Sequence, residues 1–503
     1  MTLASAAPRS KTVGGARRTS LGALALSGSS ALRLSLQLAL LPILARLIGP
    51  AEYGLVALAA PFVLFAGVLS DGGMSYALGR RREVSRETES TAFWLAAGIG
   101  LTLTLLCCGA AWPMGAILRQ PRLPMLIVAL SPILLMNGLT AASNGRIIRD
   151  GRFASFAIGD LMSTGAGAAV ALTAALNGFG AWSLVAQQLA LWTVKLAWVS
   201  FAGGARVGFW FNLEDARELL SFGLHTIGAL MADFVSRNID NLIIGAVLGA
   251  TTLGYYAMAY QVVRTPDMLI SGPFYLYIFT AISKAANDGA PGAAQDLAAA
   301  ALRLGSAFLA PLFAGLALIA DLAVPLVLGD KWLGAIAPLR WLAGAGFFFC
   351  LCSIMATTLM GLGRSALQFR LSLGLGAATI VAVGLMAQFG LTIVSAALVA
   401  STAATCALYM HFLGRGLGTS RRKLATALGP AVAGTGAMTA ALLALRAALP
   451  SLPAPLALAV DVAAGALVYA GVIWPTGGRR LVADARAFAH AQSDQPEAAT
   501  APT

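Results

Sequence analysis

The chain has 503 residues, of which 58% are apolar and only 11% are charged. These proportions, with a mean hydropathy of +0.79, exclude a disordered chain, a coiled coil and almost any soluble enzyme. A spanning helix needs about 20 predominantly apolar residues, so the composition can supply at most about fourteen spans. The sequence therefore predicts an all-α polytopic membrane protein.

Apolar runs follow one another along the chain, separated by charged or Gly/Pro-rich breaks. They predict about fourteen transmembrane helices, several of them long enough to be tilted. The runs cover residues 21–49, 51–78, 91–118, 123–145, 155–177, 180–203, 221–249, 251–282, 298–328, 332–361, 365–389, 391–413, 424–447 and 453–476.

Basic residues are concentrated in every second connection between these runs. The connections in between are short and nearly uncharged. The net charge of +13 is therefore attributed to the orientation of the chain in the membrane. The positive-inside rule places the basic loops and both termini in the cytoplasm, and a nucleic-acid partner is not expected. The basic connections contain Arg80, Arg81, Arg82, Arg86, Arg146, Arg149, Arg152, Arg206, Arg217, Lys284, Arg364, Arg415, Arg421, Arg422, Lys423, Arg479, Arg480 and Arg486.

An internal repeat relates two blocks of six runs. The stretch 47–59 has a counterpart at 247–259, in which two glycines and two alanines recur at an offset of 200 residues. Four small residues could match by chance in so Gly/Ala-rich a chain, but each stretch also joins the first and second run of its block. Phe179-Gly180 and Phe389-Gly390 give a weaker echo. Because each block has an even number of spans, the repeats are predicted to be parallel, which favours a transporter with alternating access.

This organisation predicts six segments. They are a cytoplasmic N-terminal segment at 1–20, an N-terminal six-helix bundle at 21–203, a cytoplasmic linker at 204–220, a C-terminal six-helix bundle at 221–413, an additional helix pair at 424–476 and a disordered cytoplasmic tail at 477–503. All five cysteines lie inside apolar runs without metal-ligand spacing, so they are read as small buried hydrophobic residues. No metal, cofactor or catalytic residue is predicted.

Three segments resemble the bacterial polysaccharide-biosynthesis flippases, in particular the colanic-acid-exporter type. These belong to the O-antigen and exopolysaccharide branch of the multidrug/oligosaccharidyl-lipid/polysaccharide exporter superfamily. The segments are ARLIGPAEYG at 45–54 with SDGG at 70–73, SRNIDNLIIG at 236–245 continuing into 248–256, and LGDKW at 328–332 with Pro338-Leu339-Arg340. The likeness covers about residues 20–415.

The resemblance implies a protein that is not an enzyme. It implies a flippase that carries a polyprenyl-pyrophosphate-linked sugar repeat unit across the bacterial inner membrane. We further expect a monomer that works beside a polysaccharide polymerase.

Charged residues in the seventh run are candidates for a functional role, because a charge at mid-membrane costs about 2.5–3.5 kcal/mol. Asp233, Arg237 and Asp240 are spaced four and three residues apart and share one helix face. In the functional interpretation Arg237 contacts a phosphate or sugar, and the carboxylates tune it or couple transport to a cation. The alternative is a self-neutralising structural pair, which the position of Asp240 near the end of its span favours for that residue.

The eighth run carries a polar and aromatic stripe of Tyr256, Tyr260, Arg264 and Asp267. The planar guanidinium of arginine suits a pyrophosphate, and tyrosine suits sugar rings through its apolar body and polar tip. The alternative is a polar seam between helices. No partner on their own helices supports Lys195, Asp321 or Asp461, and these three stay unassigned.

In the first run, Arg33 and Gln37 share a face four residues apart. Arg33 is the best substrate-binding candidate of the N-terminal half. A snorkelling arginine is the alternative.

Two other functions fit parts of the sequence. A cation-coupled multidrug exporter has the same architecture, although the extra pair at 424–476 counts against it. A membrane glycosyltransferase or polymerase would need a long external loop with catalytic residues, and the external connections are short. No phosphate-binding Gly-x-x-x-x-Gly-Lys loop occurs, so the energy is expected from an ion gradient, the membrane potential or the supply of substrate.

Overall fold

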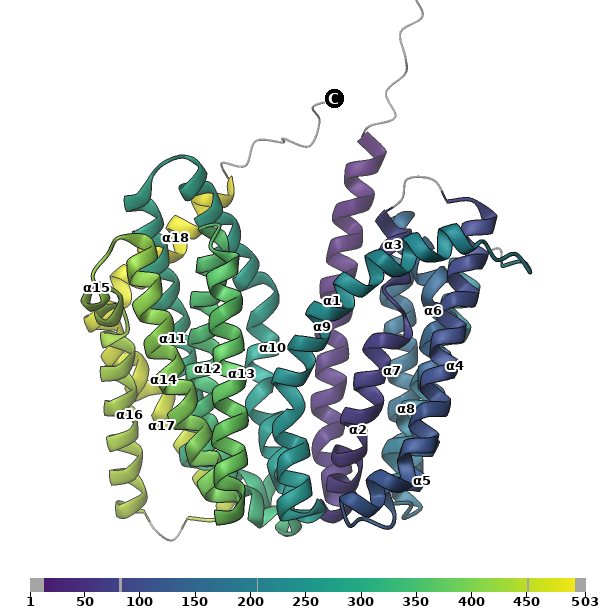
Figure 1. Ribbon diagram of the computed structural model, residues 1–503. Helices are drawn as coiled ribbons and strands as arrows, with labels where there is room; N and C mark the ends of the chain where they lie inside the picture. Colours follow the sequence, from purple (N-terminus) through teal and green to yellow (C-terminus); the bar gives the residue numbers. More distant parts are fainter. Residues whose placement is uncertain (1–12, 81–83, 206, 450–451, 494–503) are drawn as a thin grey trace, which may run out of the picture. The chain divides into compact units, whose positions relative to one another are not determined.

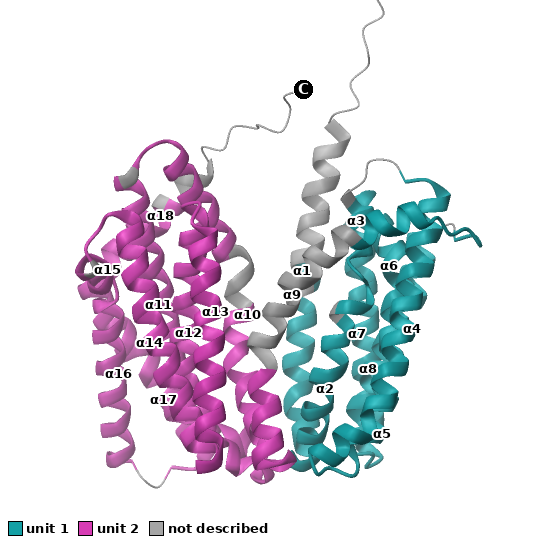
Figure 2. Cartoon of the chain, viewed as in Figure 1, with its two compact units in different colours: residues 1–235 teal, residues 236–503 magenta. Residues whose placement is uncertain are grey.

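The computed structural model describes residues 13–80, 84–205, 207–449 and 452–493. All regular elements of these residues are helices (Figure 1). The chain forms two compact units, Met1–Val235 and Ser236–Thr503, here called unit 1 and unit 2 (Figure 2). For some helical residues the structure describes the backbone but not the side chain. These are residues 13–27, 30, 31, 68, 76, 80, 221–238, 269–273, 291, 421, 487 and 489–493.

Unit 1 is built from helices that run back and forth along its length (Figure 1). The last helix, α9 (Leu213–Leu248), crosses the boundary into unit 2. The others are α1 (Val13–Leu47), α2 (Pro50–Ser70), α3 (Met74–Arg80), α4 (Arg86–Ile117), α5 (Leu123–Leu130), α6 (Pro132–Arg149), α7 (Phe153–Leu176) and α8 (Ala181–Gly203).

Unit 2 continues from α9 through a second set of helices. Its elements are α10 (Ala250–Asn287), α11 (Pro291–Ala323), η1 (Val324–Leu328), η2 (Asp330–Ala335), α12 (Ile336–Gly361), α13 (Ser365–Met386), η3 (Ala387–Phe389), α14 (Leu391–Leu417), α15 (Arg421–Ala427), α16 (Gly429–Ala448), α17 (Ala454–Ile473), η4 (Trp474–Gly478) and α18 (Arg479–Ser493).

The predicted polytopic membrane fold is confirmed. Among the described residues, eleven helical stretches are long and apolar enough to cross a membrane. The runs predicted at 21–49, 221–249 and 251–282 coincide with α1, α9 and α10, each of which includes side chains outside the described part. The full count of fourteen therefore stays a prediction.

The glycines that suggested the internal repeat occupy corresponding places in the two units. Gly49 directly precedes α2, and Gly249 directly precedes α10. Gly180 and Gly390, from the weaker echo, directly precede α8 and α14 and both have positive φ. These positions support the predicted repeat, which stays a prediction.

The prediction of a disordered tail at 477–503 is wrong for part of that range, because α18 occupies Arg479–Ser493. Its sequence is small and polar, but it is rich in alanine, the residue with the highest helix propensity. Asp484 also fixes α18 to α11: its carboxylate accepts from Nε and Nη2 of Arg303 at 2.7 and 3.0 Å. At the other predicted boundary, α9 begins at Leu213, inside the segment expected to be a linker at 204–220.

Small residues let α4 and α6 approach closely in unit 1. A Cβ placed on Gly138 would lie 2.4 Å from the backbone oxygen of Ala96, and one on Gly100 would lie 2.7 Å from that of Leu134. Both positions therefore accept only glycine without a backbone shift. Such close contact is the main source of helix association in a membrane, where burial of apolar surface gives no driving force.

Both parts of the first segment that carries the family resemblance, 45–54 and 70–73, have structural roles in unit 1. Glu52, in the first turn of α2, accepts from Arg122 Nη2 at 3.0 Å and from the Ala181 backbone N–H at 3.0 Å. It thereby joins the start of α2 to the start of α8. Gly72 and Gly73 have φ of +60° and +73° and form the turn between α2 and α3, where Ser75 Oγ donates to Asp71 at 2.5 Å.

Candidate functional site

A charged cluster joins three helices inside unit 1. Arg33 of α1 forms an ion pair with Asp160 of α7, with 3.2 Å between Nε and Oδ2. Lys195 of α8 interacts electrostatically with both residues. Its Nζ also lies 4.9 Å from the ring centroid of Trp192 and 5.9 Å from that of Phe156, which is cation–π geometry. We call Arg33, Asp160 and Lys195 the α1–α7–α8 cluster.

The cluster lies within the apolar length of its helices. At a rise of about 1.5 Å per residue, Asp160 is about 10 Å from the start of α7, and Lys195 is about 12 Å from the end of α8. Among the side chains that the structure describes, two cations face this one carboxylate, which leaves one positive charge of the cluster in excess. The Arg33 side chain is 42% exposed and can contact a further anion. Ionisable side chains inside a membrane are costly, so this cluster is a candidate for a functional role.

The structure thus gives Arg33 a partner that the first-run pattern did not reveal. It is paired with Asp160 rather than only extended toward the membrane surface. Gln37, predicted to share its face, is exposed. The side chains of Asp233 and Arg237 lie outside the described part of the chain, so the roles predicted for them stay predictions.

In unit 2, Asp240 and Tyr256 form a buried pair between α9 and α10. Tyr256 donates its hydroxyl to Asp240 Oδ2 at 2.6 Å, and both side chains are buried. The Tyr256 ring stacks on Tyr260 with centroids 5.9 Å apart, and Arg264 interacts electrostatically with Asp240. Four predicted residues are therefore brought together. For Tyr256 and Asp240 the contacts are those of a polar seam between helices.

Asp267 has partners of its own in unit 2. Its Oδ1 accepts from the Tyr275 hydroxyl at 2.9 Å, and Cys350 Sγ of α12 lies 3.7 Å away. Tyr275 was missed from the sequence, although it lies eight residues after Asp267 on the same helix. A spacing of two helical turns is the signal that could have found it.

The two carboxylates that the sequence left unassigned, Asp321 and Asp461, contact the same arginine. Arg446 of α16 donates through Nη1 to both oxygens of Asp321 of α11, at 3.0 and 3.1 Å. Its Nε donates to Asp461 of α17 at 2.8 Å. We call this three-residue group the α11–α16–α17 network. It fixes the C-terminal helix pair to α11 within unit 2.

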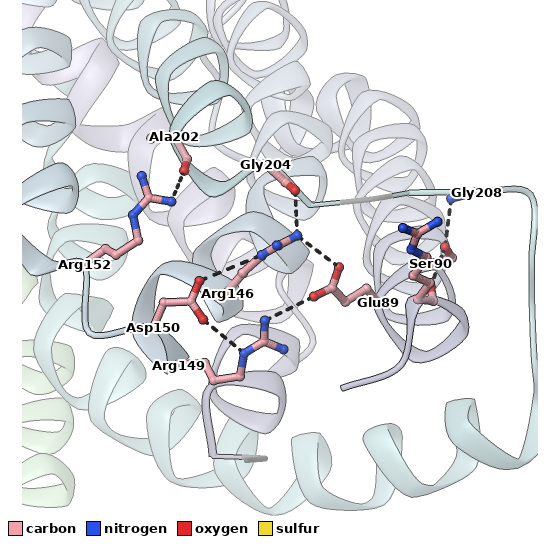
Figure 3. A network of polar contacts seen from close by, with 10 residues as sticks. Glu89, Ser90, Arg146, Arg149, Asp150, Arg152, Ala202, Gly204 and Gly208 are labelled. Carbon is pink, nitrogen blue, oxygen red and sulfur yellow. Dashed lines mark hydrogen bonds and ion pairs between the residues drawn. The ribbon is translucent and has the colours of Figure 1, made fainter. Parts of the chain in front are cut away.

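Arginines of the basic connections also hold helix ends together in unit 1 (Figure 3). Arg149 contacts the buried Glu89 of α4, with 3.4 Å between Nη2 and Oε1. Arg146 donates to the carbonyl of Gly204 at 2.7 Å, and Arg152 donates to that of Ala202 at 2.6 Å. Cations favour the C-terminal carbonyls of a helix, so these arginines stabilise the end of α8. These arginines therefore hold helix ends together, in addition to the role in membrane orientation that the sequence predicts for them.

Solved structures of two kinds of transporter share this fold. The structure titled "Lipid II flippase MurJ, inward closed conformation" matches with a TM-score of 0.70 and 14% identity, over 92% of this chain and 99% of that one. An inward-facing multidrug resistance MATE family transporter of the MOP superfamily matches with a TM-score of 0.56 and 15% identity, over 77% of this chain and 96% of that one. The fold is therefore that of these membrane transporters.

The family follows from the sequence match. Residues 43–337, more than half of the chain, match the family described as "Polysaccharide biosynthesis protein". The chain belongs to this family. It is 27% identical over 332 residues to the succinoglycan biosynthesis transport protein ExoT of Rhizobium meliloti (strain 1021), covering 65% of this chain and 66% of the relative, just under two thirds of its length. It is 24% identical over 371 residues to the lipopolysaccharide biosynthesis protein WzxC of Escherichia coli (strain K12), covering 72% of each.

Proposed function

We propose that this protein is a flippase that moves a polyprenyl-pyrophosphate-linked oligosaccharide repeat unit across the bacterial inner membrane, for cell-surface polysaccharide synthesis. Three findings support the proposal: membership of the polysaccharide biosynthesis family, a fold shared with a lipid II flippase, and the α1–α7–α8 cluster. The cluster is the observation that carries it. Its described side chains carry two cations for one carboxylate, and such an excess of positive charge inside the membrane is suited to an anionic cargo and unsuited to a cationic one.

In this proposal the two six-helix bundles alternate access to the two membrane faces, with both termini in the cytoplasm. Arg33 binds the pyrophosphate through the parallel N–H groups of its guanidinium, and Lys195 adds a second positive charge. The other proposed substrate contacts are Gln37, Arg237, Tyr256, Tyr260 and Arg264. Asp233, Asp240 and Asp267 are proposed to tune these cations or to couple transport to an ion.

Further parts of the proposal concern the energy source and the partners. The protein works without catalysis, on an ion gradient or on the removal of cargo at the far side. It acts as a monomer beside a polysaccharide polymerase, and the lipid bilayer is its solvent and the carrier of its substrate.

Transport in proteoliposomes tests the proposed site. We expect the native chain to move a fluorescent pyrophosphate-linked lipid sugar between leaflets, and R33A to be at least tenfold slower because it loses the bidentate contact. R237A and R264A test the other two proposed arginines. The matched control is R479A, an exposed arginine at the start of α18. If R33A, R237A and R264A all transport at the native rate, the proposed site is wrong even if the native chain is active.

A second candidate function has support from the fold. The MATE transporter match fits a cation-coupled multidrug exporter. Such a protein would move apolar cations, which the net positive charge of the α1–α7–α8 cluster repels. The same vesicles, loaded with a cationic dye, distinguish the two functions.

A further inference from the structure

Unit 2 contains a basic pocket that the proposed transport does not use. The pocket has a volume of about 230 Å³ and is lined by residues of α11, α15, α16, α17, η4 and α18. Its eleven lining residues include three cations, Arg303, Lys423 and Arg480, and no carboxylate. We propose that it binds the phosphate group of an anionic lipid headgroup.

The charges of the pocket leave room for an added anion. Asp484 occupies Nε and Nη2 of Arg303, which fixes the guanidinium and leaves the N–H groups of Nη1 for another acceptor. Lys423 is 3.0 Å from Asp296, whose side chain is 75% exposed and therefore contributes little. Within the described part of the chain, Arg480 pairs with no carboxylate. A phosphate would complete this set with charge-assisted hydrogen bonds.

The position of the pocket favours a lipid phosphate over a free one. It lies where the membrane-spanning helices α16 and α17 meet the short elements that flank them. Trp474, at the start of η4, is 69% exposed, and tryptophan is enriched at the level of lipid headgroups. Two basic sequences, at 421–423 and 479–480, adjoin the pocket. Basic pockets between membrane helices on the cytoplasmic side are typical sites for anionic headgroups.

The chain offers two matched pairs of variants for the test. K423Q and R480Q each remove a cation that lines the pocket. R422Q and R479Q remove the neighbouring cation in the same basic sequence, which is exposed and does not line it. Arg303 stays unchanged, because its ion pair holds α18 to α11.

The measurement is a titration of the purified full chain in detergent, with the thermal unfolding midpoint as readout. The probes are phosphatidylglycerol, phosphatidylcholine and inorganic phosphate. We expect phosphatidylglycerol to raise the midpoint more than phosphatidylcholine. K423Q and R480Q should each weaken its apparent affinity about fivefold, while R422Q and R479Q should change it less than twofold.

Two results would overturn the site. One is equal stabilisation by phosphatidylglycerol and phosphatidylcholine, and the other is an equal loss of affinity in all four variants, which would indicate a diffuse charge effect. A third result would keep the site and overturn the lipid assignment: inorganic phosphate alone gives the variant-sensitive shift, and phosphatidylglycerol adds nothing. None of these outcomes depends on whether the chain transports a glycan lipid.

Discussion

At the scale of single residues, two arginines inside the spanning helices pair with carboxylates on other helices. Arg33 meets Asp160, and Arg446 meets Asp321 and Asp461. The two groups differ in balance. The α11–α16–α17 network has two carboxylates for one arginine, and Arg340 also lies 3.5 Å from Asp321. In the α1–α7–α8 cluster, by contrast, the described side chains supply two cations for one carboxylate. We infer that the first serves packing and the second serves binding.

Replacing Asp160 tests this view of the cluster. D160N leaves Arg33 and Lys195 facing each other without a carboxylate, so we expect a loss of about 1 to 3 kcal/mol in the free energy of unfolding, less than for a fully buried pair because Arg33 is partly exposed. Denaturant titration in mixed micelles measures it.

The matched control is the exposed pair formed by Lys423 and Asp296. A double-mutant cycle over Arg33 and Asp160 should give a coupling above about 0.5 kcal/mol, and a cycle over the control pair should give nearly none. Equal coupling in the two cycles would contradict the structural account of the cluster.

At the scale of elements, two devices hold helices together: close backbone contact in unit 1 and the α11–α16–α17 network in unit 2. The network is reinforced at α11 by Tyr469 of α17, whose hydroxyl donates to the Ala307 carbonyl at 2.6 Å, and by the Arg303–Asp484 pair. The C-terminal part of the chain is therefore held against α11 at several positions along that helix. We expect α16 and α17 to move together with α11 during transport.

Removing Arg446 should loosen that helix pair. R446Q leaves Asp461 unpaired, with a side chain only 4% exposed, which costs about 3 kcal/mol. Hydrogen exchange should rise in α16 and α17 and stay unchanged in α13. The control R340Q, which removes a half-exposed pair at 3.5 Å, should have little effect. Unchanged exchange in R446Q would show that the network does not hold the pair.

Adding a methyl group at Gly138 tests the contact between α4 and α6. G138A places a Cβ against the Ala96 backbone oxygen, so we expect a loss of about 1 to 3 kcal/mol from overpacking. G98A is the control on α4, because a Cβ there meets nothing within 4 Å. The thermal midpoint of each purified variant measures the difference. Equal midpoints for G138A and G98A would contradict the close approach.

At the scale of the whole molecule, hydropathy predicts most of the fold, because each spanning helix is specified by its own apolar run. The partners of the charged residues could not be predicted in this way. Lys195, Asp321 and Asp461 had no partner on their own helices, and Asp160 was missed, because the groups that satisfy them come from helices far away in the sequence. The helix α18 was missed because its small polar residues concealed a strong helix propensity.

Our main proposal is that this chain moves an anionic lipid-linked glycan. Its most direct test is to compare two cargoes in proteoliposomes of the native chain: a pyrophosphate-linked oligosaccharide lipid and an apolar cationic dye. We predict exchange of the glycan lipid between leaflets well above the rate in empty vesicles, and no export of the dye. Export of the dye without exchange of the lipid would contradict the proposed function.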